Sequence, residues 1–297
     1  MASSSRNWAK QLYWSAIPAY GCGYLLVHSM RDYGLPIEYL YVDRHAMEPS
    51  EGFLSLVESE VDKMKGLRNA KLKVTMTDKM EPKVYGGFFL NRGAEIQFPL
   101  RYAFSDVEHL RRQGAHIELD LGYAKNRRKL EVNSEICQQL FERILLTDSA
   151  KRFAIQRELQ IANSGLIFSF PIITQAAVFL GGYLSVPLLA PFLGPTIPYV
   201  LAFCASTASY VALRPVFDGY LTRLADKLTL TEHPEYLAGA RDYFQNVLSL
   251  NRLLRRIMGA EGEACIKKDG ESRLDALPIH TRLAAVEERA QQSNNRV

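Results

Sequence analysis

Charged residues disappear from the chain over one long stretch near its middle. The 55 residues from Leu159 to Leu213 include no Asp, Glu, Lys, Arg or His, although 23% of the whole chain is charged. A helix rises ~1.5 Å per residue and needs ~20 apolar residues to cross a bilayer. The stretch therefore predicts a transmembrane hairpin over residues 161–213, with helices at Leu166–Leu189 and Ile197–Leu213.

Prolines cluster where this hairpin is expected to turn. A proline removes an amide donor and clashes with the preceding helical turn, so several are not expected within one helix. Four lie close together, at Pro187, Pro191, Pro195 and Pro198. They predict the turn between the two helices.

The second apolar helix is rich in small residues, which suit close helix packing more than contact with lipid. They define a small-residue face that is expected to pair with a helix. Its partner is either another protein or the first helix of the same hairpin. The face consists of Ala202, Ala205, Ser206, Ser209 and Ala212.

Before the hairpin, the apolar pattern changes between helical and strand spacing. Residues 50–65 carry apolar positions at helical spacing behind Ser50, a good capping residue. Residues 71–77 and 94–100 alternate apolar and polar side chains, which predicts two strands joined by a segment containing Gly86 and Gly87. Residues 116–121 are a possible third strand.

Helical spacing then dominates on both sides of the hairpin. A helix is expected to follow Asn133, and another to start at Thr147 or Asp148 and run unbroken into the first crossing. After the hairpin, Pro234 is expected to open a long amphipathic helix. Its apolar stripe contains Tyr236, Leu237, Ala240, Tyr243, Phe244, Val247, Leu248 and Leu254.

These patterns predict an α+β, mostly helical protein with a small sheet and a two-helix transmembrane hairpin. The expected parts are a targeting segment or weak membrane helix, an αβ part, the hairpin, a helical part that completes the body, and a disordered tail. They cover residues 1–35, 36–160, 161–213, 214–290 and 291–297.

The amino-terminal segment allows more than one interpretation. It holds Arg6, Lys10 and Arg31 with no acidic residue before Asp32, a bias typical of mitochondrial import signals. The nearly uncharged stretch from residue 11 to 30 could instead form a third membrane helix. A secretory signal is a further alternative, without a clear cleavage site.

The composition and net charge indicate which classes of partner to expect. The net charge is +4 and the mean hydropathy −0.11, which suits an ordinary soluble body beside the membrane segment and gives no reason to expect nucleic acid as a partner. Four scattered cysteines do not suggest a disulfide framework.

Basic residues lie on both sides of the hairpin and none lies in its turn, so the body is expected on the matrix or cytoplasmic side. These residues are Lys151, Arg152, Arg157, Arg214, Arg223 and Lys227.

The order of these elements resembles the membrane-integrated zinc metallopeptidases. In that family the helix before the hairpin carries H-E-x-x-H, in which two imidazoles bind zinc and the glutamate activates water. The matching stretch here is Arg157-Glu158-Leu159-Gln160-Ile161, and the position of the third ligand is Thr222, four residues before Asp226. Because the zinc ligands are missing, no metal, cofactor or catalytic residue is expected, and Glu158 is expected near Asp226, paired with Arg157 or Arg223.

A second resemblance covers roughly the carboxy-terminal half. The stretches AKRFAIQREL and YLTRLADKLTLTEHPEYLAGARDYFQNVLSLNRLLRRIMGAEGE resemble the transmembrane protein 177 family of the mitochondrial inner membrane. This resemblance implies a non-catalytic factor in cytochrome c oxidase assembly that associates with newly made subunit II and stabilises that subunit's assembly chaperone. Two alternatives stay open: a divergent membrane protease with relocated ligands, and an adaptor for membrane protein quality control.

Overall fold

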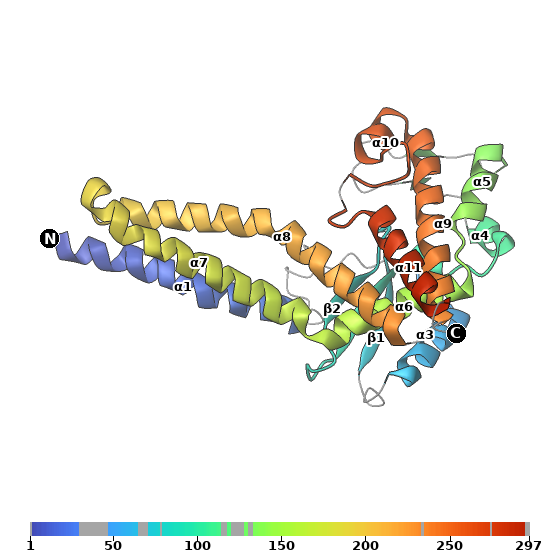
Figure 1. Cartoon of the computed structure of the whole chain (residues 1–297), viewed down its shortest axis with the longest axis horizontal. Coiled ribbons are helices and arrows are strands. Elements are labelled where there is room, and N and C mark those ends of the chain that lie inside the picture. The colour runs from blue at the N-terminus through green and yellow to red at the C-terminus, as the bar shows by residue number, and fades with distance from the viewer. Residues whose placement is uncertain are drawn as a thin grey trace. The chain divides into compact units, whose positions relative to one another are not determined.

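The computed structural model describes residues 2–29, 47–64, 71–77, 79–113, 118–119, 128–129, 133–232, 235–273 and 275–294. These residues are mostly helical with a small sheet, which confirms the predicted α+β, mostly helical class (Figure 1). The chain divides into two compact units. The first contains Met1–Val42 and Ser164–Leu221, and the second contains Asp43–Asn163 and Thr222–Val297.

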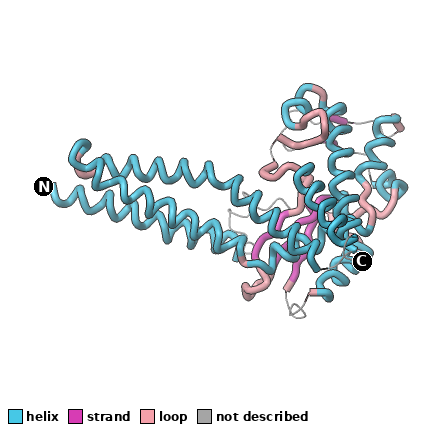
Figure 2. Tube along the Cα trace, in the orientation of Figure 1, coloured by secondary structure: helices cyan, strands magenta, loops and turns pink. Residues whose placement is uncertain are grey.

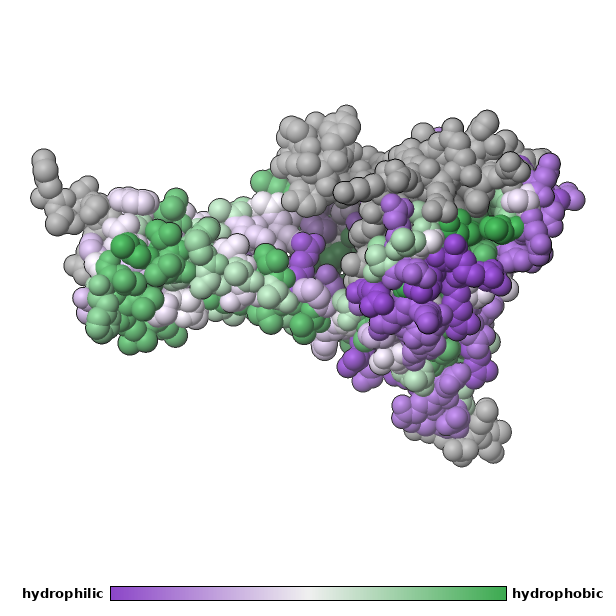
Figure 3. Space-filling view, turned by 90° about the horizontal axis from the view of Figure 1, so that it is seen from above, coloured by the Kyte–Doolittle hydropathy of each residue, from purple (hydrophilic) through white to green (hydrophobic). Residues whose placement is uncertain are grey.

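The first unit is built from long helices. It contains α1 (Ala2–Ser29), α7 (Leu166–Leu193) and the first part of α8 (Ile197–Glu232). Two segments, Leu166–Leu193 and Ile197–Thr231, are long and apolar enough to cross a membrane, and only 11% of the most apolar window of each is buried. A core helix of a soluble protein would be mostly buried, so the apolar surface in Figure 3 favours lipid as its surroundings.

Only two of the four prolines mark the turn as predicted: Pro195 lies in it and Pro198 follows it at the start of α8, while Pro187 and Pro191 lie inside α7. Helix α7 continues to Leu193 and contains Pro171, Pro187 and Pro191, while the turn lies at residues 194–196. Prolines are tolerated in membrane helices when other donors satisfy the carbonyls that they leave free. At Pro171 this donor is visible, because the hydroxyl of Tyr24 on α1 donates to the carbonyl oxygen of Ile167 at 2.9 Å.

Three other boundaries differ from the predictions. Helix α6 (Asp148–Ser164) does not run unbroken into α7, since Gly165 adopts a left-handed conformation with φ of 64°. The cap of α5 (Glu135–Ile144) is Ser134 and not Asn133, because the Ser134 hydroxyl accepts the amide of Cys137. The second crossing also has no separate end, as α8 is continuous to Glu232.

The sheet of the second unit contains β1 (Leu72–Thr77), β2 (Lys83–Gly86) and β3 (Ala94–Pro99). Strand β3 lies between the others, parallel to β1 and antiparallel to β2. The strands are the magenta segments of Figure 2. The two predicted strands are confirmed, and β2 was missed. Of the possible third strand, the described residues form β4 (Glu118–Leu119), which pairs with β5 (Arg128–Lys129) in a separate two-stranded sheet.

Helices pack around the sheet to form the core. Met76, Ile96 and Phe98 from the strands join Phe153 of α6 and Phe244 of α9 (Glu235–Met258) in one buried cluster. Residues of α3 (Glu51–Lys63), η1 (Leu100–Tyr102) and α11 (Ile279–Asn294) belong to the same cluster, while α4 (Val107–Gln113) and α10 (Ala260–Cys265) contribute to two smaller ones.

The last two long helices, α9 and α11, agree with the predictions in part. The apolar stripe of α9 is confirmed, since most of its members are buried. Pro234, its expected first residue, lies outside the described residues. The tail predicted to be disordered from residue 291 begins as helix, because α11 extends to Asn294.

Candidate functional site

Helix α6 carries the motif of Arg157 to Ile161 and is largely enclosed by protein. Eleven of its 17 residues are buried, so its polar side chains need partners within the fold. Arg157 and Glu158 pair with each other: Arg157 Nε donates to Glu158 Oε1 at 2.7 Å, and Nη2 lies 2.5 Å from the same oxygen. This contact confirms the expected pairing of Glu158 with Arg157.

The ion pair determines what Glu158 can do chemically. Burial raises the pKa of Glu158, and the charge and hydrogen bond of Arg157 oppose this rise. A glutamate that activates water needs an accessible carboxylate within reach of its substrate. Glu158 is 3% exposed and held by a guanidinium, so its position suits a structural role.

Asp226 lies on α8 and has a different partner from the one expected. Arg282 of α11 donates from Nε to Asp226 Oδ2 at 2.7 Å and from Nη2 to Oδ1 at 2.9 Å. Arg223, one of the two arginines expected to pair with these carboxylates, is exposed. A guanidinium matches a carboxylate through two parallel hydrogen bonds, and Arg282 is further held 4.4 Å from the ring centre of Phe244. The expected pairing with Arg157 or Arg223 therefore holds for Glu158, while Asp226 pairs with Arg282.

Glu158, Asp226 and their arginine partners nevertheless interact electrostatically. The charge of Arg282 acts on Glu158, and the charge of Asp226 acts on Arg157. Thr222 and Ile161, at the positions of missing zinc ligands, are partly buried. Among the residues that the structure describes, no three His, Cys, Asp or Glu side chains group as ligands for a metal ion.

Arg101 belongs to the same region and was missed by the sequence analysis. It lies in η1, is 6% exposed, and places its guanidinium carbon 5.5 Å from the ring centre of Tyr243. The guanidinium carbon of Arg157 lies 5.6 Å from the same centre. One signal could have revealed it: Arg101 is the lone charge in the run FPLRYAF, whose other residues suit a core.

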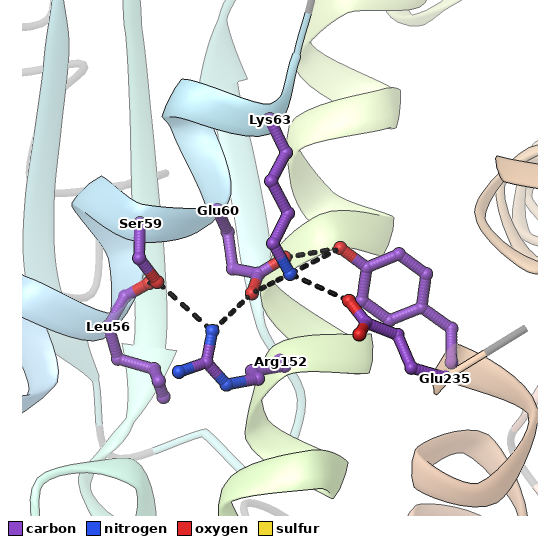
Figure 4. Close-up of polar contacts among 7 residues, drawn as sticks. Leu56, Ser59, Glu60, Lys63, Arg152 and Glu235 are labelled. Atoms are coloured by element: carbon purple, nitrogen blue, oxygen red, sulfur yellow. Dashed lines mark hydrogen bonds and ion pairs between the residues drawn. The ribbon is translucent and has the colours of Figure 1, made fainter. Parts of the chain in front are cut away.

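A second polar cluster surrounds Glu60, a fully buried carboxylate on α3 (Figure 4). Lys63 contacts Glu60 at 2.9 Å, Arg152 of α6 contacts it at 2.7 Å, and the hydroxyl of Tyr236 on α9 donates to it. Lys63 also pairs with Glu235 at 2.8 Å. The Glu60 cluster thus joins α3, α6 and α9, and these contacts account for the burial of the Glu60 carboxylate.

Asp275 is a further titratable group that the sequence did not single out. It precedes α11, and burial together with the negative charge of Glu81 raises its pKa to about 6. A hydrogen bond from Ser272 and the charge of Arg282 oppose the rise. Asp275 therefore changes charge in a mildly acidic range in which ordinary aspartates stay ionised.

The small-residue face of α8 is divided between two environments. Ala202 and Ser206 are buried within the first unit, where Ser206 Oγ lies 3.3 Å from the hydroxyl of Tyr13. Ala205, Ser209 and Ala212 are exposed. The sequence analysis had left both packing partners open, and the exposed three remain available to another helix.

The amino-terminal helix α1 packs on the same unit. Tyr13 is 1% exposed and donates its hydroxyl to the carbonyl oxygen of Phe179 on α7. A Cβ on Gly182 would lie 2.1 Å from Ser206 Oγ and 2.9 Å from the Tyr13 hydroxyl, so glycine is required for this approach. Segment 1–35 therefore includes a helix with packing partners of its own.

No protein-family model, curated protein or solved structure matches this chain.

Proposed function

We propose that this protein is a non-catalytic scaffold of the mitochondrial inner membrane that acts in cytochrome c oxidase biogenesis. It would hold newly made subunit II and stabilise the assembly chaperone of that subunit. The proposal of a scaffold rests on one observation above all: both carboxylates left at the motif positions, Glu158 and Asp226, are held by arginines. A catalytic centre would need at least one of them free to meet a ligand.

The membrane part of the proposal rests on α7 and α8. Both are apolar and expose most of their apolar side chains. Arg214 and Arg223, which follow the second apolar segment, are exposed and favour the matrix side for the body. The role in oxidase assembly rests on the resemblance to the transmembrane protein 177 family.

Compartment and orientation can be tested together. Mitochondria that carry the chain with a carboxy-terminal tag are extracted with alkali and then treated with protease before and after the inner membrane is opened. The protein is expected to stay in the membrane fraction, with a tag that protease reaches only after opening. Release of the intact protein by alkali, or a tag cleaved when only the outer membrane is open, would contradict the proposal.

Partner binding is tested on the exposed part of the small-residue face. Ala205→Leu combined with Ser209→Leu is expected to reduce co-purification of the oxidase assembly chaperone and of new subunit II. The matched control changes two exposed residues of another side of α8, Thr207→Leu with Val211→Leu. Equal recovery with both pairs would count against this face.

Two further measurements separate the proposal from its alternatives. Stoichiometric zinc in the purified protein would favour a divergent membrane protease. Proximity labelling that enriches protease subunits instead of oxidase factors would favour a quality-control adaptor.

A further inference from the structure

Three arginines of the second unit lie among buried aromatic rings, and two of them have carboxylate partners. Arg157 binds Glu158 and Arg282 binds Asp226, in both cases through Nε and Nη2. These two nitrogens form the edge of a guanidinium that matches a carboxylate. Arg282 contacts both oxygens of Asp226 in this way, whereas both nitrogens of Arg157 contact the single oxygen Oε1 of Glu158.

Arg101 presents the same edge without an acceptor. Its Nε and Nη2 are buried, and neither donates a hydrogen bond within the part of the chain that the structure describes. Its contacts are with the rings of Tyr102 at 5.8 Å and Tyr243 at 5.5 Å, measured from the guanidinium carbon to the ring centres. Aromatic faces attract the cation but do not accept its in-plane N–H groups.

Among the described residues, no carboxylate forms a hydrogen bond with the buried Nε or Nη2 of Arg101. An arginine keeps its proton throughout the physiological range, so the positive charge stays. The phenol next to it cannot become the anion, since burial raises the pKa of Tyr102 well above its usual value. The two nearby carboxylates Glu158 and Asp226 are each bound by another guanidinium, so neither is paired with Arg101. A buried charge without a counter-ion is unfavourable, and an anionic ligand would correct this.

We propose that the Nε–Nη2 edge of Arg101, between the rings of Tyr102 and Tyr243, is a binding site for a single carboxylate group supplied from outside the described fold. Carboxylate is the favoured class because the two neighbouring arginines take carboxylates through the same edge. The edge is enclosed by protein, so the group belongs to a small organic acid or to one acidic side chain that enters the body. This site is independent of the proposed scaffold function.

The test uses the purified full chain in detergent at pH 7. Its thermal unfolding is followed by scanning calorimetry while sodium acetate replaces sodium chloride at constant ionic strength. Acetate is expected to raise the unfolding temperature, since a ligand that binds only the folded state stabilises it. No rise with acetate or with the peptide probe described below would overturn the proposal, and so would an equal rise with phosphate, which lacks the planar shape of a carboxylate.

Substitutions of Arg101 test whether the response to acetate comes from this site. Arg101→Met is expected to weaken acetate binding by at least about tenfold, while Arg111→Met, at an exposed arginine of α4, leaves it unchanged. Arg101→Lys keeps the charge but removes the fork, and is expected to lose most of the response even if the methionine variant does not fold. An undiminished response in Arg101→Lys would refute recognition through the Nε–Nη2 edge.

A last comparison distinguishes the two sources of the carboxylate. A short peptide with blocked ends and one glutamate is compared with acetate, and its glutamine analogue is the control. A response to acetate indicates a small acid as the ligand. A response to the glutamate peptide alone indicates an acidic side chain of a partner, and a response to the glutamine peptide would contradict a carboxylate site.

Discussion

The pair of Arg282 and Asp226 allows a quantitative test of how the second unit is held together. The two side chains are 7% and 11% exposed and are joined by two short hydrogen bonds. Removing one partner of a buried pair leaves the other charge uncompensated and costs about 3–5 kcal/mol. Removing both charges avoids that penalty. We therefore expect each single substitution, Arg282→Met or Asp226→Asn, to cost more than half of the stability that the double substitution costs.

The pairwise term comes from a double-mutant cycle. A coupling free energy of at least about 2 kcal/mol is expected between the two substitutions. The stacking of Arg282 on Phe244 is lost in both variants that lack Arg282, so it cancels in the cycle. The matched control is the pair of Arg255 and Glu263, at 2.9 Å but with Glu263 largely exposed, for which a coupling below about 1 kcal/mol is expected.

The assay has to report on the second unit. Both tryptophans, Trp8 and Trp14, lie in α1, so tryptophan fluorescence follows the first unit. Urea unfolding of the full chain in detergent is therefore followed by hydrogen exchange of peptides from α9 and α11. Additivity of the two single substitutions to within about 0.5 kcal/mol would refute the argument.

Three shorter predictions concern other parts of the molecule. Asp275→Asn should be more stable than the wild type at pH 7 by about 1 kcal/mol, allowing for solvent screening. The raised pKa of about 6 makes the charged form unfavourable in the folded state, so the gain should shrink as pH falls from 6 to 4 in urea titrations. Gly239→Ala should cost about 2 kcal/mol in the same titrations, because its Cβ would lie 2.3 Å from the carbonyl oxygen of Ser149. Gly182→Leu should loosen α1 and speed amide exchange over residues 8–29, measured by mass spectrometry.

Periodicity explains what could be predicted from the sequence. The stripe of α9 and the uncharged stretch of α7 and α8 extend over many turns, so a few irregular residues do not hide them. Strand β2 has only four residues and no clear alternation, and it is stabilised by pairing with β3, which is a tertiary contact. The carboxy-terminal end of α7 was misjudged because the effect of a proline depends on the donors that neighbouring helices offer.

The candidate site was predicted less well than the fold, for a physical reason. Arg157 and Glu158 are adjacent in the sequence, and their pairing could be anticipated. Asp226 and Arg282 are 56 residues apart, and only the packing of α11 against α8 brings them together. The environment of Arg101 likewise depends on Tyr243 in a distant helix.

The hydroxyl that Tyr24 donates to the carbonyl of Ile167 also bears on how the chain can mature. Pro171 offers no amide at this point, and hydrocarbon contains no water to replace the donor. A processing peptidase that removed residues 2–29 would withdraw this hydroxyl and expose the surface that Tyr13 covers. Removal of α1 would thus destabilise the first unit, which makes α1 a structural helix of the folded protein.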